Sequence, residues 1–248
     1  MCRFFGYVGE GRHLKDLVLA LISSAGFDPL KPAPIKRHGD GWGYVLTLKN
    51  LHIFGRSGSP IYHEAPLALS VASRAFSEDV LLLMHARAAS RNEPLGVDAA
   101  HPFMGEMPNG DLIFLAHNGG IDKKGLAQHL GLEKLVNKYP DSYFILKAVQ
   151  RYTDPSKGVP EVIDLIHRNG WLRSASNIIV VWLRAGGPPR LLVYPYHDGE
   201  EKYYEMFRVR PREGGGEAFV SSTIAIKLSD GWVKEALRPG ELIVKELK

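Results

Sequence analysis

The only cysteine of this chain stands where it could act as a nucleophile. Cys2 directly follows Met1, and no other cysteine occurs among the 248 residues. Removal of Met1 would leave Cys2 with both a thiol and a free α-amine. An α-amine titrates near ~7.7–8.0, so it can act as a general base at neutral pH. N-terminal nucleophiles combine both groups in one residue. The alternative is that Cys2 is a small buried hydrophobe.

Polar residues also follow two long apolar runs. The segments "VLLLMHARAAS" and "DLIFLAHNGG" begin as continuous apolar stretches, which are typical of strands buried on both faces. Arg87 ends the first run, and a guanidinium at a buried strand end usually has an anionic partner, although a surface salt bridge is the alternative. Asn118 and Gly119 end the second run, where Asn-Gly-Gly could simply form a turn.

Several motifs occur in an order that resembles a known family. They are "MCRFFGYVG", "RHGDGWGYV", "LMHARAAS", "HPF", "LAHNGGI" and "YPDSYF". This order resembles class II glutamine amidotransferases, which are Ntn hydrolases with an N-terminal cysteine, and in particular the stand-alone group that includes γ-glutamyl hydrolases of thiol metabolism. The segment "EAFVSSTIAIKLSDGWVKEALRPGELIVKE" also resembles the C-terminal signature of that family. The resemblance therefore covers nearly the whole chain, and any one motif is weaker than the set.

The resemblance implies a fold and a reaction. We expect a single glutamine amidotransferase type 2 domain over residues 1–248, with an α+β, four-layer αββα sandwich of two antiparallel sheets. The expected reaction is hydrolysis of the γ-amide of glutamine or a γ-glutamyl compound through a Cys2 thioester. It would release glutamate and ammonia or an amine, and it would need no cofactor.

The resemblance also implies roles for individual residues. Cys2 is the nucleophile, and the Asn118 side-chain amide and the Gly119 backbone N–H form the oxyanion hole. Arg87 binds the substrate α-carboxylate. Asp141 in "YPDSYF" binds the α-ammonium, although it is also a candidate N-cap of a following helix. Tyr143 departs from the family pattern, which commonly has Glu there.

The segment "HGDGWG" is the least specific of the motifs. The resemblance places this loop near the nucleophile, where glycines allow close backbone approach. It gives His38 and Asp40 roles in tuning the site and binding substrate, with Trp42 starting the next strand. A plain turn is the alternative.

The histidines do not predict a metal site. His38, His85, His101 and His117 lie in the motifs, but no two histidines have His-x-x-x-His spacing. Cys2 has no cysteine or histidine close to it in sequence. We therefore expect packing roles for His85 and His117, and His101 as part of a loop wall.

These residues must be held by strands and helices that the apolar pattern indicates. Strands are expected over 3–9, 80–84 and 111–117 and in a hairpin of 42–48 and 51–55, and further strands follow from residue 176 onward. Helices are expected over 13–26, 64–76, 142–152 and 159–171. The stretch "REGGGE" is expected to be a hairpin loop.

Composition limits the class of protein. The net charge of +4 comes from 31 Lys and Arg against 27 Asp and Glu, without a basic block typical of nucleic-acid binding. No apolar run is long enough to span a membrane, and the N-terminus lacks the pattern of a signal peptide. One cysteine fits a reducing cytoplasm. The scarcity of Asn, Gln and Cys is a feature of thermophile proteins.

Two questions of function stay open from the sequence. The chain ends after the hydrolase signature, so we expect no attached synthase domain. It could feed ammonia to a separate synthase subunit, or it could be a free-standing hydrolase. The alternative from another class is a non-catalytic regulatory or binding subunit that retains the fold.

Overall fold

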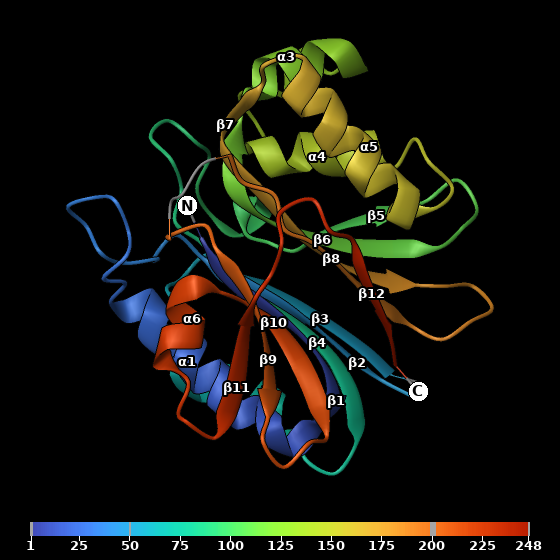
Figure 1. The fold of residues 1–248 in the computed structure, drawn as a ribbon. Coiled ribbons are helices and arrows are strands. Elements are labelled where there is room, and N and C mark those ends of the chain that lie inside the picture. The colour runs from blue at the N-terminus through green and yellow to red at the C-terminus, as the bar shows by residue number, and fades with distance from the viewer. Residues whose placement is uncertain (1, 50, 199–201, 248) are drawn as a thin grey trace.

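The computed structural model describes residues 2–49, 51–198 and 202–247. Its core consists of two antiparallel sheets (Figure 1). The seven-stranded sheet has the order β11-β9-β10-β1-β4-β2-β3 and is formed by β1 Arg3–Glu10, β2 Trp42–Leu48, β3 Leu51–Ser57, β4 Asp79–Ala86, β9 Met206–Pro211, β10 Gly216–Ser221 and β11 Trp232–Ala236. The five-stranded sheet has the order β12-β8-β7-β6-β5 and is formed by β5 Phe103–Glu106, β6 Leu112–Ile121, β7 Leu172–Leu183, β8 Arg190–Tyr194 and β12 Ile243–Glu246.

Helices cover the outer face of each sheet. The seven-stranded sheet packs against α1 Leu14–Gly26, α2 Ala65–Ser73 and α6 Ser222–Lys227. The five-stranded sheet packs against α3 Lys123–Leu130, α4 Asp141–Val149 and α5 Pro155–Arg168, which lie at the top of Figure 1. Three short 3₁₀ turns complete the described elements: η1 Gly11–His13, η2 Val97–Ala99 and η3 Glu133–Leu135. The expected αββα order of layers is confirmed.

The two sheets share an apolar core between them. Phe4 and Leu83 from one sheet meet Ile179 and Leu191 from the other in this layer. Leu82, the neighbour of Leu83, faces the opposite way, toward α1 and α2. Because alternate residues of a strand point to opposite faces, a strand between two apolar layers must be apolar throughout. This explains the continuous run of β4.

The expected elements agree with the structure in most places. The hairpin of β2 and β3 is confirmed, with Asn50 of its turn outside the described residues. The "REGGGE" loop between β9 and β10 is confirmed, with positive φ at its glycines. The structure adds α3, α6, β5 and β11, which the pattern did not single out.

The start of α5 differs from the expectation. The helix begins at Pro155 rather than at residue 159, because the Asp154 side chain accepts a hydrogen bond from Ser156 N at 2.8 Å and proline is favourable in the first turn.

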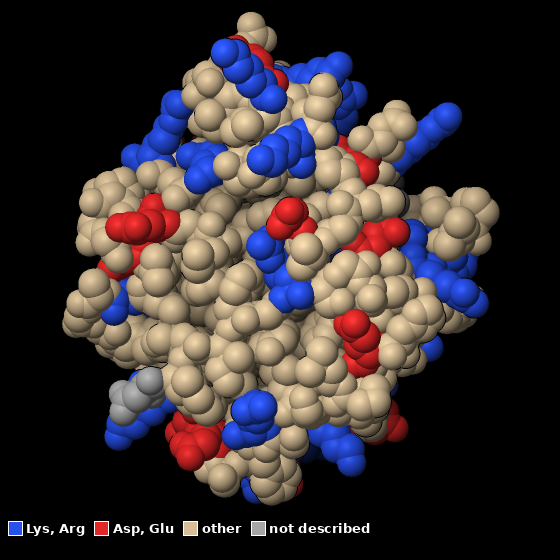
Figure 2. Space-filling model, turned by 180° about the vertical axis from the view of Figure 1, so that it is seen from behind, with Lys and Arg blue, Asp and Glu red and all other residues tan. Residues whose placement is uncertain are grey.

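The surface carries charges of both signs. Figure 2 shows Lys and Arg interspersed with Asp and Glu over the face opposite to that of Figure 1. Charge therefore singles out no binding surface on that face. None of the helices in the part of the chain described here has the length and apolar character needed to cross a membrane.

Candidate active site

The polar ends of strands from both sheets meet at Cys2. Strand β1 pairs with β4 so that Arg3 lies opposite Ala86, which places Cys2 at the level of Arg87. The other sheet contributes Asn118 from β6. The Cys2 backbone N donates a hydrogen bond to Asn118 Oδ1 at 2.9 Å. Cys2 therefore sits where the two sheets face each other.

A small pocket lies over Cys2. Four of the residues predicted for the site line it, namely Cys2, Arg87, Gly119 and Asp141. The other lining residues are Ala88, Ala89, Ser90, Glu93, His101, His117, Pro140 and Ser142. Its volume is about 30 Å³, roughly the space of one water molecule.

The Cys2 thiol lies in an environment that favours the thiolate. Its side chain is buried, and burial by itself raises the pKa of a thiol. The neighbouring His85 ring, through its electrostatic effect and a hydrogen bond, is the main group that outweighs burial and lowers the pKa of Cys2 to about 6. A thiolate is the reactive form of cysteine.

Asn118 presents an unpaired buried donor beside Cys2, and Gly119 follows it in β6 and lines the pocket. The Asn118 amide is oriented by its bond from Cys2 N, and its Nδ2 has no partner among the described residues. A buried donor without an acceptor costs about 1–3 kcal/mol, so this amide is suited to an incoming oxygen. A Cβ at Gly119 would lie 1.8 Å from the Ala175 carbonyl oxygen, so only glycine fits there.

Arg87 is a buried cation with spare hydrogen-bonding capacity. It is 2% exposed, and its Nη1 has no partner in the described part of the chain. The backbone holds it firmly: Arg87 N donates to Gly41 O at 2.8 Å, and Asp40 N donates to Arg87 O at 3.0 Å. The Asp40 side chain accepts from Ala89 N at 2.8 Å. Asp40 thus fixes the segment that carries Arg87, and it lies outside the pocket lining.

Asp141 both begins a helix and lines the pocket. It is the first residue of α4, and its Oδ1 accepts from Ser142 N at 2.8 Å. Its Oδ2 accepts from Ile121 N at 3.1 Å, which ties α4 to the end of β6. The N-cap residue of α4 is Pro140 and no side chain caps this helix, so the interpretation of Asp141 as an N-cap is wrong.

His38 lies behind the pocket rather than in its lining. It is fully buried, and its Nε2 is 2.8 Å from Asp28 Oδ2. Asp28 also accepts from Arg3 Nε and from Thr223 Oγ1, both at 2.6 Å. Burial lowers the pKa of His38 to about 4, so the ring is neutral at pH 7. This buried cluster holds the residue that follows Cys2.

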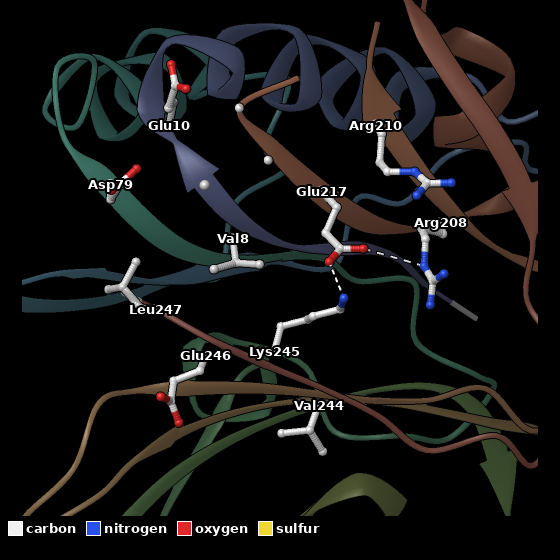
Figure 3. Close-up of a pocket in the computed structure, with 13 residues that line it drawn as sticks. Val8, Glu10, Asp79, Arg208, Arg210, Glu217, Val244, Lys245, Glu246 and Leu247 are labelled. Atoms are coloured by element: carbon white, nitrogen blue, oxygen red, sulfur yellow. Dashed lines mark ion pairs between the residues drawn. The ribbon is translucent and has the colours of Figure 1, made fainter. Parts of the chain in front are cut away.

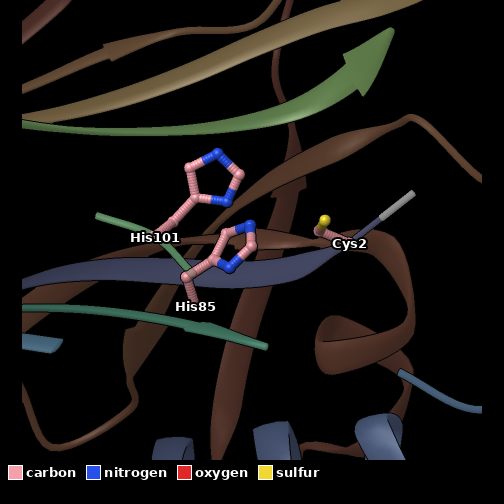
Figure 4. Close-up of side chains that lie close together, drawn as sticks. All are labelled: Cys2, His85 and His101. Atoms are coloured by element: carbon pink, nitrogen blue, oxygen red, sulfur yellow. The ribbon is translucent and has the colours of Figure 1, made fainter. Parts of the chain in front are cut away.

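The structure also brings two further histidines to the nucleophile. His85 and His101 lie beside Cys2 in Figure 4, with ring centroids 4.2 Å apart. His85 follows the apolar run of β4 and His101 begins "HPF", so their positions were visible in the sequence. Their contact was not, because it depends on how β4 lies against the loop before β5.

A second, larger cavity lies at the other end of β1. It has a volume of about 690 Å³ and is lined by Glu10, Glu217 and Lys245 among others (Figure 3). Glu217 forms ion pairs with Arg208 and Lys245. Other charged residues of the lining pair outside it, Arg210 with Glu235 and Glu246 with Arg190. The cavity lies away from Cys2, which is not in its lining.

Comparison with known proteins shows the fold. No model of a known protein family matches the chain, and no curated protein matches its sequence. One similar solved structure is described as the allosteric regulatory enzyme of purine biosynthesis, with a TM-score of 0.68 and 15% identity. Another is glutamine phosphoribosylpyrophosphate amidotransferase from B. subtilis in complex with ADP and GMP, with a TM-score of 0.66 and 15% identity. Each match covers 99% of this chain but only 47% of the other, so this chain spans about half their length.

Proposed function

We propose that this chain hydrolyses the γ-amide of glutamine or of a γ-glutamyl compound, with Cys2 as the nucleophile. The observation that carries the proposal is the pocket at Cys2. A thiol of lowered pKa and a buried guanidinium with a free nitrogen line this pocket, and Asn118, whose amide donor has no acceptor among the described residues, is hydrogen-bonded to Cys2 N beside it. The structural likeness to an amidotransferase supports the same reaction.

The first half of the proposed reaction forms a thioester. The Cys2 α-amine, set free by removal of Met1, takes up the thiol proton directly or through a water. The thiolate attacks the γ-carbonyl carbon, and Asn118 Nδ2 and Gly119 N donate to the resulting oxyanion. Collapse of this intermediate expels ammonia or an amine, which leaves with a proton.

The second half releases glutamate. A water, deprotonated by the same amine, attacks the thioester carbonyl, and the same two donors stabilise the second oxyanion. Cleavage of the carbon–sulfur bond returns the thiol and gives the free γ-carboxyl. No step in this scheme requires a cofactor.

The two charged residues of the pocket would orient the substrate. Arg87 binds the α-carboxylate, because its Nη1 is buried and lacks a partner. Asp141 binds the α-ammonium. His38 and Asp40 are not in the pocket lining, so we propose that they support the site from behind through Asp28 and Ala89.

We propose that the pocket widens when substrate binds, because its interior volume in this structure is only about 30 Å³. Lys123 Nζ lies 2.9 Å from Glu93 Oε2, and this pair joins the pocket lining to the start of α3. Movement of the lining segment that carries Glu93 would admit the substrate.

The test measures glutamate released from glutamine and from a panel of γ-glutamyl dipeptides and amines. It uses protein whose loss of Met1 is verified by mass, with Cys2→Ala as the control. We expect release by the processed chain and none by Cys2→Ala, and a much slower rate in a form that retains Met1, whose Cys2 nitrogen is an amide. A glutamine-like diazo-ketone should label the processed chain once, at Cys2. Label in Cys2→Ala, or no glutamate from any substrate, would contradict the proposal.

The same panel separates the remaining alternatives. Preference for glutamine, with release raised by a second subunit, would support a supplier of ammonia. Preference for a γ-glutamyl amine or peptide would support a free-standing hydrolase. A non-catalytic regulatory subunit would bind a member of the panel without turnover.

A further inference from the structure

We propose that Cys2, His85 and His101 bind a divalent cation of the zinc class, and that the bound ion inhibits the reaction. The inhibition rests on the proposed function, whereas the binding does not. The three residues come from the start of β1, from β4 and from the loop before β5 (Figure 4).

The donor atoms of these residues are close together and buried. One ligand atom from each, the Cys2 sulfur and one nitrogen of each ring, all lie within 4.8 Å of one another. All three side chains are at least nine-tenths buried. The site is therefore formed by the packing of the fold and does not depend on mobile surface groups.

His85 Nε2 lies 3.3 Å from the His117 carbonyl oxygen, but the other ring nitrogens of His85 and His101 are unpaired within the described part of the chain. Neither Nδ1 nor Nε2 of His101 has a hydrogen-bond partner among the described residues, and the same holds for Nδ1 of His85. Buried imidazole nitrogens normally have a partner, because leaving them unpaired costs free energy. Two imidazoles with unpaired nitrogens, each offering one ligand atom within 4.8 Å of the Cys2 sulfur, indicate a missing ligand.

The type of donor selects the ion. A thiolate with two imidazoles suits Zn²⁺ or its analogue Cd²⁺, whereas Mg²⁺ and Ca²⁺ prefer oxygen. Zn–S bonds of ~2.3 Å and Zn–N bonds of ~2.0–2.1 Å place tetrahedral ligands roughly 3.5 Å apart, so small rotations of the rings would close the site. Binding forms three dative bonds and releases the thiol proton to solvent. Since Cys2 and His101 both line the pocket, a water there could complete the coordination.

The inhibition follows from the role of the thiol. A thiolate that donates its electron pair to a metal cannot attack a carbonyl. The ion would also occupy part of a pocket that holds little more than a water molecule. Removal of the ion by a chelator would restore activity.

Binding is tested with Cd²⁺ as the probe, on protein first treated with EDTA and freed of it. The measurement is the ultraviolet charge-transfer absorption of a Cd²⁺–thiolate bond, and Zn²⁺ is then tested for displacement. We expect one Cd²⁺ per chain and complete loss of the signal after alkylation of Cys2. Even residues that only orient a ligand contribute about 10- to 100-fold to metal affinity, so His101→Gln should weaken binding by at least about tenfold.

The controls distinguish a loss of metal binding from a loss of folding and from a loss of catalytic activity. His63→Gln changes an exposed histidine outside the site and should bind Cd²⁺ like the parent chain. Circular dichroism checks that His101→Gln is folded. The alkylated parent chain tests the loss of Cd²⁺ binding without any substitution. No thiolate absorption, or equal affinity in His101→Gln and the parent chain, would overturn the proposal. Glutamate release measured in the presence of EDTA tests the proposed function alone. If added Zn²⁺ does not reduce the rate of glutamate release, the proposed inhibition is overturned.

Discussion

At the scale of single residues, Asn118 connects the nucleophile with the position of the reacting carbonyl. Its Oδ1 accepts from Cys2 N, so its Nδ2 must point away from that nitrogen, and Nδ2 has no acceptor among the described residues. The amide thus has a defined orientation before substrate arrives. A donor that is already oriented needs no reorganisation when charge develops.

We expect Asn118→Ala to lower kcat by ~10²–10³-fold with little change in KM, because the lost donor acts on charge present only in the transition state. Asn118→Asp is the sharper variant. It keeps the shape and the acceptor for Cys2 N but replaces the donor with a carboxylate that repels the oxyanion. It should be at least as damaging as Ala. A near-normal kcat in Asn118→Asp would show that this side chain does not face the carbonyl.

The lowered pKa of Cys2 predicts a pH profile for its alkylation. Because the thiolate is the reactive species, the rate constant with a small alkylating reagent should rise as pH increases through about 6 and then level off. His85→Gln removes the ring that chiefly lowers the pKa of Cys2, so the alkylation profile of this variant should shift to higher pH. The measurement is the second-order rate constant between pH 4.5 and pH 9.5. A midpoint near ~8.5 in the parent chain, the value of a free cysteine, would contradict the inferred environment.

At the scale of elements, the first residues of β1 are held by a charged cluster in the interior. The Arg3 guanidinium donates to Asp28 at 2.6 Å and to Tyr203 O at 2.9 Å, and it lies 3.8 Å from the centre of the Tyr203 ring. Both charged side chains are fully buried. The long loop between α1 and β2, which contains Asp28 and His38, therefore fixes the strand that begins after the nucleophile.

Asp28→Asn should lower the free energy of unfolding by ~3–5 kcal/mol, because it leaves the buried Arg3 charge without its partner. Although burial alone raises the pKa of Asp28, hydrogen bonds from His38 and Arg3 lower it well below its usual range. A depressed carboxyl pKa stabilises the fold above the unfolded pKa of ~3.9, and this stability is lost as pH falls through the lower folded value. The difference in the free energy of unfolding between the parent chain and Asp28→Asn should therefore shrink below about pH 4. Urea unfolding at several pH values measures it.

The matched control for this prediction is Asp230→Asn, which changes an exposed carboxylate. Its effect should stay within about 0.5 kcal/mol. Equal stability of Asp28→Asn and Asp230→Asn at pH 7 would show that the buried pair does not anchor β1.

The sequence predicted elements better than it predicted their contacts. Continuous apolar runs gave β4 and β6 because each is buried on both faces, and the polar ends of those runs gave Arg87 and Asn118. Asp28 carries no such signal, since it lies in a Pro-rich loop and its partner Arg3 is distant in sequence. The contact of His85 with His101 depends on strand register and loop path, which residue spacing does not encode. The short α6 lies in "STIAIK", which is too brief for a helical period to show.

At the scale of the whole molecule, the site exists because two sheets pack face to face. Cys2 precedes a strand of one sheet and Asn118 belongs to the other, so the spacing of the sheets sets the distance between them. Gly6 of β1 faces the other sheet at close range. A Cβ there would lie 2.9 Å from Leu191 Cδ1 and 3.0 Å from Ile179 Cγ2 across the interface.

This contact predicts that substitutions at Gly6 and Leu191 have non-additive effects on the free energy of unfolding. Gly6→Ala should destabilise the chain by ~1–3 kcal/mol through overpacking, and Leu191→Ala should do so by ~2–5 kcal/mol through a cavity. Together they should cost less than their sum, because removal of the Leu191 side chain makes room for the new methyl group. The expected coupling is about 0.5–3 kcal/mol, measured by urea unfolding of both single variants and the double variant.

Leu192→Ala is the control for the same experiment, because it isolates the layer between the sheets. Leu192 is the neighbour of Leu191 on β8 and is equally buried, but it packs with the helices on the outer face. It does not approach Gly6, so its effect should add to that of Gly6→Ala within about 0.5 kcal/mol. If Leu191→Ala were also merely additive, the side chain of Leu191 would not limit how closely the sheets approach. The separation of Cys2 from Asn118 would then have to be fixed by contacts nearer to the pocket.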